Sequence, residues 1–360
     1  MDWKSILEMG DLPQLVQQIN SLPRAEIEHH CRDLIIADCD PTEAGDAIAL
    51  LFSFSSVDCR PLLMNLIHAR LLYPPSTFHR ASPAVSTALS ELLVEGIDHL
   101  EMEDAVKALM WVGDDLAVEC LRKWMEETPG WFKSHAERGH SIESFSHTGG
   151  WELLPTGERR TLVLEQCRSL EHAEPHDPAS GKSGSPLIGG FKSELKCECC
   201  GRALVSLLQW SEIESSPLEM AELPAHFNAL CCLYCVMQGG ESFARAHPSG
   251  AVEWHKVVDG TTEDAGEGHL KNLQLRPLRF GDERPPRHSF QEFFPVCHSQ
   301  IGGFPTWIQD ASFPSCVECR KTMSFVGQVS APALGYYDEG IFYSFWCEAC
   351  RLSATSFQMG

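Results

Sequence analysis

The sequence is short of basic residues. Lysine and arginine together number 28 against 50 aspartates and glutamates, which gives a formal net charge of −22. Phosphate binding needs clustered basic side chains, so this balance argues against a nucleic-acid partner. It favours a basic protein as partner, with a solvated surface that has no partner as the alternative. Residues 1–178 carry about 30 acidic and 14 basic side chains, a net charge of about −16, so the acidic excess lies mainly in the first half.

The sequence also lacks long apolar runs. No stretch approaches the roughly 18–20 apolar residues that a membrane helix needs. The first residues, Met1–Lys4, lack the basic segment and apolar core of a signal peptide. We therefore expect a cytoplasmic protein with no membrane contact. In a reducing compartment, the sixteen cysteines are better suited to metal binding than to disulfides.

Catalytic motifs are missing as well. The sequence contains no His-Glu-x-x-His helix, no Gly-x-Ser-x-Gly elbow and no phosphate-binding glycine loop. Cys297 and His298 are the best nucleophile and base candidates, but adjacent residues of a strand point to opposite faces. His140, His147 and His255 are candidates for a third metal site, with packed or exposed side chains as the simpler interpretation. We predict no catalytic residue; the alternative is an enzyme with a site in a cleft between domains.

Helical periodicity dominates the first 127 residues, where apolar side chains recur at spacings of three and four residues. Asp114 and Ser82 stand where helix caps are expected, and Pro83 stands at a first turn. Short helices with tight connections favour a HEAT-like array, with an irregular bundle as the alternative. The predicted helices are Trp3–Met9, Leu12–Ser21, Arg24–Ala37, Thr42–Phe54, Arg60–Leu72, Ala84–Glu95, Glu103–Trp111 and Asp115–Glu127.

Domain boundaries follow from composition. We predict a helical domain over residues 1–171, which includes an aromatic cap around Pro129–Trp151 and a last helix, Thr161–Leu170. Residues 172–186 have the composition of a linker. Residues 187–360 contain short β-prone runs, Ala203–Trp210, Met323–Val329 and Gly340–Trp346 among them. The expected fold class is therefore α+β multidomain: an all-α HEAT-like array followed by a β-rich domain.

Two sets of Cys-x-x-Cys pairs in the second half of the chain are candidate metal ligands. Cys316 and Cys319 are followed about thirty residues later by Cys347 and Cys350. Two residues between thiolates let one tight turn present both sulfurs to one ion, and two such turns complete a tetrahedral shell of four cysteines. Thiolates select zinc or iron over hard cations, so we predict structural zinc, with an iron–sulfur cluster or metal-free thiols as alternatives.

The first set is ambiguous because it holds six cysteines. We predict Cys197, Cys200, Cys232 and Cys235 as the ligands, with Cys199 and Cys231 as possible alternative ligands. Gly201 supports the choice, since a glycine just after a knuckle can take positive φ. Cys199 and Cys231 are interpreted as packed side chains, with ligand exchange or redox sensing as the alternative.

Matched offsets indicate that the two sets belong to an internal duplication. Ile-Gly-Gly-Phe precedes each set, at residues 188–191 and 301–304. Phe227 stands five residues before Cys232, and Phe342 stands five before Cys347. We predict two β-rich copies, at about 187–255 and 300–360, each pinned by its own zinc, so that metal binding contributes to folding.

One stretch resembles a known family. The run Ile301–Gln309, the Cys316 and Cys319 pair, Met323–Gln328 and Phe342–Cys350 are similar to the bacterial YwqG-like family and to the C-terminal region of the programmed cell death protein two family. The resemblance covers residues 295–358 well and 186–240 as a degenerate copy. It implies no established catalytic activity. Its eukaryotic side implies a chaperone for a basic ribosomal protein, and its bacterial side implies an immunity or partner-binding protein.

The expected function is therefore non-catalytic. We expect a zinc-stabilised protein with two structural zinc ions per chain that binds a basic partner, either a toxin that it neutralises as an immunity protein or a client that it chaperones. A zinc-ribbon nucleic-acid binder is the alternative that the acidic charge disfavours.

Overall fold

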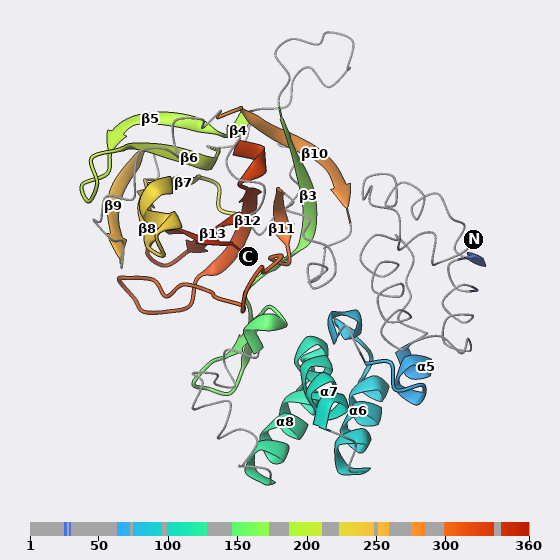
Figure 1. Ribbon diagram of the computed structural model, residues 1–360. Coiled ribbons are helices and arrows are strands. Elements are labelled where there is room, and N and C mark those ends of the chain that lie inside the picture. The colour runs from blue at the N-terminus through green and yellow to red at the C-terminus, as the bar shows by residue number, and fades with distance from the viewer. Residues whose placement is uncertain are drawn as a thin grey trace. The chain divides into compact units, whose positions relative to one another are not determined.

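The computed structural model describes residues 25–26, 29, 63–72, 75–95, 99–127, 146–172, 187–210, 223–247, 251–258, 275–284, 299–334 and 340–359. The chain divides into two compact units (Figure 1). One comprises residues 1–161 and 287–293, and the other comprises residues 162–286 and 294–360. Neither unit contains, within these ranges, a helix long and apolar enough to cross a bilayer.

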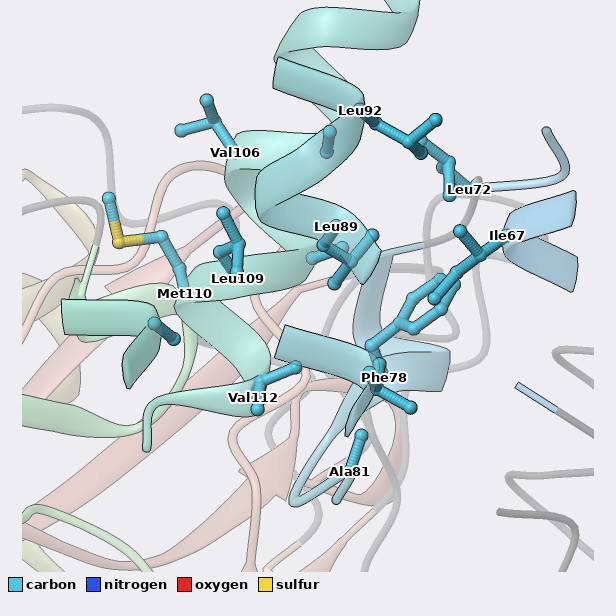
Figure 2. Packing of buried hydrophobic residues seen from close by; sticks show 14 of the residues in the cluster. Ile67, Leu72, Phe78, Ala81, Leu89, Leu92, Val106, Leu109, Met110 and Val112 are labelled. Atoms are coloured by element: carbon cyan, nitrogen blue, oxygen red, sulfur yellow. The ribbon is translucent and has the colours of Figure 1, made fainter. Parts of the chain in front are cut away.

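The described helices of the first unit pack around one apolar core. They are α5 (Leu63–His68), the 3-10 helix η2 (Pro75–Phe78), α6 (Pro83–Glu95), α7 (His99–Val112) and α8 (Asp115–Glu127). Leu63, Phe78, Leu89 and Leu109 are fully buried in this core, part of which is shown in Figure 2. Trp151 belongs to the same core, and its indole N–H donates to the Met110 carbonyl at 2.7 Å.

Local signals at two helix starts are confirmed. The Asp114 carboxylate accepts the Ala117 backbone N–H at 2.7 Å and the Ser86 hydroxyl at 2.8 Å, so it caps α8 and ties that helix to α6. Pro83 is the first residue of α6, where its missing N–H costs nothing. Helix α8 has the predicted bounds, Asp115–Glu127.

The predicted fold class is wrong. The part of the chain that the structure describes is mostly β-sheet, without an N-terminal all-α HEAT-like array. Helix α6 contacts α5, α7 and α8 in one cluster, and strands β1 (Trp151–Leu153) and β2 (Arg159–Thr161) form a sheet inside the predicted helical domain. The helices predicted before residue 55 lie outside the described residues, apart from residues 25, 26 and 29, which are helical.

The predicted helix Thr161–Leu170 is also wrong, because this segment forms β3 (Leu164–His172). Gly302 of the neighbouring strand pairs with Cys167, whereas Gly303 pairs with Leu164, so β3 carries extra residues at this point. Such a bulge breaks the two-residue alternation of a strand. The bulge turns Leu164 and Leu170 toward the same core, whereas Cys167 lies on the other face of the strand and is also buried. Buried or half-buried residues therefore recur at a spacing of three, and this spacing imitates a helix.

Two antiparallel sheets form the second unit. The larger sheet has the strand order β4-β10-β3-β11-β12-β13-β14-β8-β9, and the smaller has the order β5-β6-β7. The predicted strand Ala203–Trp210 is β6, and the predictions at Met323–Val329 and Gly340–Trp346 fall within one residue of β12 and β13. The bounds are β4 (Leu187–Gly189), β5 (Phe191–Lys196), β6 (Ala203–Trp210), β7 (Phe227–Cys231), β8 (Glu241–Ala246), β9 (Val252–Val258), β10 (Leu278–Arg284), β11 (Gln300–Gly303), β12 (Ser324–Ser330), β13 (Ile341–Cys347) and β14 (Leu352–Gln358).

Strand β13 lies at the centre of this unit, and every one of its residues is buried. On one face Trp346 contacts Phe227 of the smaller sheet, with ring centroids 5.8 Å apart. On the other face Tyr343 contacts Trp307 at 4.7 Å, and the Tyr343 hydroxyl donates to the Thr306 carbonyl at 2.7 Å. A strand covered on both faces is expected to be mostly apolar, and in β13 Ser344 alone interrupts the apolar run.

The predicted copies at 187–255 and 300–360 share one sheet. Strand β8 and the first part of β9 come from the first range, and β8 pairs with β14 from the second. Strand β3 comes from neither range and pairs with β11. The predicted linker lies outside the described residues from 173 to 186, and the strands on either side of it, β3 and β4, belong to the same unit.

Candidate metal centres

Two turns with the same backbone hydrogen bonds present the first cysteine pair of each set. Between β5 and β6, the Cys197 N–H donates to the Arg202 carbonyl and the Gly201 N–H donates to the Cys197 carbonyl, both at 2.8 Å. Before β12, the Cys316 N–H donates to the Lys321 carbonyl at 2.8 Å and the Arg320 N–H donates to the Cys316 carbonyl at 2.9 Å. The shared offsets show that each pair occupies the same kind of knuckle.

The residue after three of the four knuckles has a left-handed backbone. Gly201 has φ +72°, which confirms the conformation predicted for it. Arg320 occupies the equivalent position with φ +62°, and Arg351 follows Cys350 with φ +54°. Left-handed φ costs a residue with a Cβ about 1–2 kcal/mol, so the two arginines are held there by the surrounding turn. Sequence reasoning missed both, because neither is a glycine.

The second pair of the first set comes from a helix. Cys232 is the N-cap of α11 (Leu233–Met237), and Cys235 lies inside that helix. The Val236 N–H donates to the Cys232 carbonyl at 3.1 Å, which closes the turn that brings the two sulfurs to the same side. In the second set, the corresponding pair follows directly from strand β13, with Cys347 as its last residue.

The structure brings the eight predicted thiols together in two groups of four. Cys197, Cys200, Cys232 and Cys235 form one group, and Cys316, Cys319, Cys347 and Cys350 form the other. Within each group all four sulfurs lie within 4.8 Å of one another.

The sulfur spacing fits one tetrahedral ion per group. Hydrogen-bond-length approaches are 3.7 Å for Cys197 to Cys235, 3.4 Å for Cys200 to Cys232 and 3.6 Å for Cys319 to Cys347. Four sulfurs at about 2.3 Å from a single tetrahedral ion lie about 3.8 Å apart. The two groups are therefore compatible with two metal sites.

Cys199 and Cys231 lie outside both groups. Cys231 is fully buried in β7 and belongs to the core around Phe227 and Phe342, whereas Cys232 belongs to the cluster around Cys197. Successive residues at this strand end point to opposite sides, so only one of two adjacent cysteines reaches the metal position. Cys199 is half-buried and packs against the same cluster as Cys197.

The thiols of each group differ in acidity. The Lys321 backbone N–H, acting against burial, lowers the pKa of Cys319 to about 7. Burial acts to raise the pKa of Cys200, but the Arg202 backbone and the neighbouring thiols outweigh it and lower that pKa. Burial raises the pKa of Cys347 to about 11 and that of Cys232 to about 12. A dication must displace the protons of such thiols, so metal binding releases protons.

An arginine lies beside each group. The Arg202 guanidinium lies 3.7 Å from the centre of the Tyr234 ring, beside the first group. At the second group, Arg245 donates to the Cys350 carbonyl at 2.9 Å and pairs with the Glu318 carboxylate. Sequence reasoning missed Arg245, which lies 105 residues from Cys350 in the chain.

Other candidate residues do not add a site. In the described ranges, no further group of three His, Cys, Asp or Glu side chains has metal-binding geometry. His255 lies on the edge strand β9. Cys297, His298 and His140 lie outside the described residues.

The fold and the eight thiols define a β-sheet protein with a pair of four-cysteine centres. No family model matches the chain, and no solved structure matches it. The chain is 30% identical over 321 residues to a protein of Salmonella typhimurium named "Uncharacterized protein YpfL". The alignment covers 88% of this chain and 72% of that protein. The chain therefore belongs to the YpfL family, and the resemblance to YwqG-like proteins stays a prediction.

Proposed function

We propose that this protein is a non-catalytic binding protein whose second unit is held together by two structural zinc ions. The observation that carries the proposal is the closed, all-thiolate donor set of each centre. A catalytic zinc site keeps a position open for water or substrate and has His or carboxylate ligands, whereas a shell of four cysteines fills all four positions with protein donors.

Zinc is the ion that suits these donors. Thiolates select zinc, copper(I) and iron over hard cations, and a tetrahedral shell of four sulfurs is typical of zinc. An iron–sulfur cluster places inorganic sulfide and several irons between the cysteines and distributes the four thiolates over different irons, whereas here all four sulfurs of a group lie within 4.8 Å of one another, as around a single ion. Zinc bound by these cysteines ties β5, α11 and β13 to their neighbouring turns and contributes directly to folding.

A basic protein is the proposed partner. The net charge of −22 favours encounter with a positively charged surface and opposes binding to nucleic acid. A toxin neutralised by this chain and a basic client that it chaperones are both partners of this chemistry.

Co-purification tests the partner proposal. The full-length, zinc-loaded chain is used as bait in nuclease-treated lysate at low and at high salt. A basic protein that is retained at low salt and released at high salt is the expected result. Recovery of background proteins alone at low salt contradicts the proposal. A mobility-shift assay at low salt checks the alternative, and a shifted nucleic acid also contradicts it.

A further inference from the structure

Strand β8 connects the two metal centres. At its start it contacts the second cysteine pair of the first centre: the Gly240 N–H donates to the Cys235 carbonyl at 3.0 Å, and the Cys232 N–H donates to the Ser242 hydroxyl at 3.3 Å. Both contacts involve residues that carry the sulfurs. The start of β8 is therefore hydrogen-bonded to the turn that holds Cys232 and Cys235, where Cys232 is the N-cap of α11.

The other end of β8 contacts the second centre. Arg245 donates to the Cys350 carbonyl at 2.9 Å and pairs with Glu318, which lies between Cys316 and Cys319. The backbone of Ala246 adds a reciprocal pair: its N–H donates to the Arg351 carbonyl at 3.0 Å, and its carbonyl accepts the Arg351 side chain at 3.1 Å. One guanidinium thus holds both knuckles of the second centre at once.

The distance between these anchors is short. Ser242 and Arg245 are three residues apart, which is about 10 Å along an extended strand. Strand β8 is paired on both sides, with β14 and β9, so it cannot bend freely between them. The two anchors thus lie on one short strand that is paired along both edges.

We propose that β8 couples metal binding at the two centres, with Arg245 as the positioning residue: an occupied first centre sets β8 so that Arg245 holds the two knuckles of the second centre together. This inference rests on the zinc sites of the proposed function. By thermodynamic linkage the coupling is reciprocal, so an occupied second centre also raises the zinc affinity of the first.

The test is a chelator titration of the full-length protein with zinc bound. At each chelator concentration the free cysteines are alkylated, and peptide mapping assigns the loss of zinc to the first or the second centre. Arg245→Met is compared with wild type and with the matched control Arg279→Met, which removes a half-buried arginine on β10 that pairs with Glu171 at 3.6 Å. No ligand is changed in these variants.

The expected result is that Arg245→Met lowers zinc affinity about tenfold at both centres, the loss that a charge-assisted hydrogen bond commonly represents. Arg279→Met leaves both centres unchanged. A loss confined to the second centre overturns the coupling, because Arg245 contacts only that centre, and so does an equal loss in Arg279→Met. A wild-type protein that holds fewer than two zinc ions instead contradicts the proposed zinc sites.

A second arm uses Cys200→Ser, which removes a ligand of the first centre. Zinc affinity at the second centre should fall about tenfold in this variant, and adding Arg245→Met should lower it by less than about twofold more. An unchanged second centre in Cys200→Ser overturns the proposal. The proposal is also overturned if the double variant loses zinc affinity at the second centre by the product of the two single-variant factors, because the two changes then act independently.

Discussion

The left-handed residue after the first knuckle of each centre gives a sharp test of the local geometry. At position 201 the structure places a glycine with φ +72°, and a Cβ added there meets nothing within 4 Å. The cost of Gly201→Ala is therefore conformational alone. Left-handed φ costs alanine about 1–2 kcal/mol, and the lower entropy of its unfolded chain returns about 0.5–1 kcal/mol. We expect Gly201→Ala to reduce the free energy of unfolding by about 1 kcal/mol.

At Arg320, the equivalent position in the second centre, we expect a substitution that raises stability instead of lowering it. Arg320 is exposed and has φ +62°, so glycine should relieve the strain there. Arg320→Ala removes the charge and keeps the strain, which makes it the reference variant. We expect Arg320→Gly to be more stable than Arg320→Ala by about 1 kcal/mol, or about 2–4 °C in melting temperature for a unit of this size.

Thermal unfolding in excess zinc measures the stability difference between the glycine and alanine variants at positions 201 and 320. The same pair of variants at Glu348 provides the control. Glu348 is exposed in the turn between Cys347 and Cys350 and does not have positive φ. Alanine at 348 should therefore be more stable than glycine, by about 0.5–1 kcal/mol. The expected pattern is that glycine is more stable than alanine at positions 201 and 320 and that alanine is more stable than glycine at position 348. Any other pattern refutes the reasoning from backbone conformation.

Three further predictions concern acidity, capping and the helical core. Burial raises the pKa of Cys347 to about 11 and that of Cys232 to about 12, above the ordinary value of about 8.5, so the zinc-free fold is favoured while these thiols are protonated. Zinc-stripped protein should lose stability as pH rises from about 8.5 toward those values, and a denaturant midpoint that does not fall over that range contradicts this. Asp114→Ala should destabilise the first unit by about 1–2 kcal/mol in chemical unfolding, and the exposed Asp115→Ala should cost less; equal losses would argue against the cap. Phe78→Ala should cost about 3–5 kcal/mol, and a loss below about 1 kcal/mol would show that Phe78 is not in a packed core.

Short-range features of this protein were predictable from its sequence. The knuckles could be found because two residues between cysteines fix the local turn, whatever the rest of the fold does. The choice of Cys232 over Cys231 followed from the same spacing, and the structure brings Cys232 to the first group. The strand at β6 and the cap at Asp114 are also set by neighbouring residues.

Long-range features were not predictable in this way. Strand β3 resembles a helix because a bulge and burial on both faces give its buried residues a spacing of three. The pairing of β8 with β14 joins residues more than a hundred positions apart, and so do the contacts of Arg245 with Cys350. No local pattern marks Arg245 as a residue of the second centre. The left-handed arginines were missed because the turn, and not the residue type, dictates their conformation.

We propose that this chain holds two structural zinc ions, each in a closed shell of four cysteines. Native mass spectrometry together with elemental analysis of the purified full-length protein tests it most directly. The wild type should carry two zinc ions per chain and Cys319→Ser should carry one, with the remaining zinc on Cys197, Cys200, Cys232 and Cys235. A wild-type chain that carries one zinc or none, or that carries iron with inorganic sulfide, contradicts it.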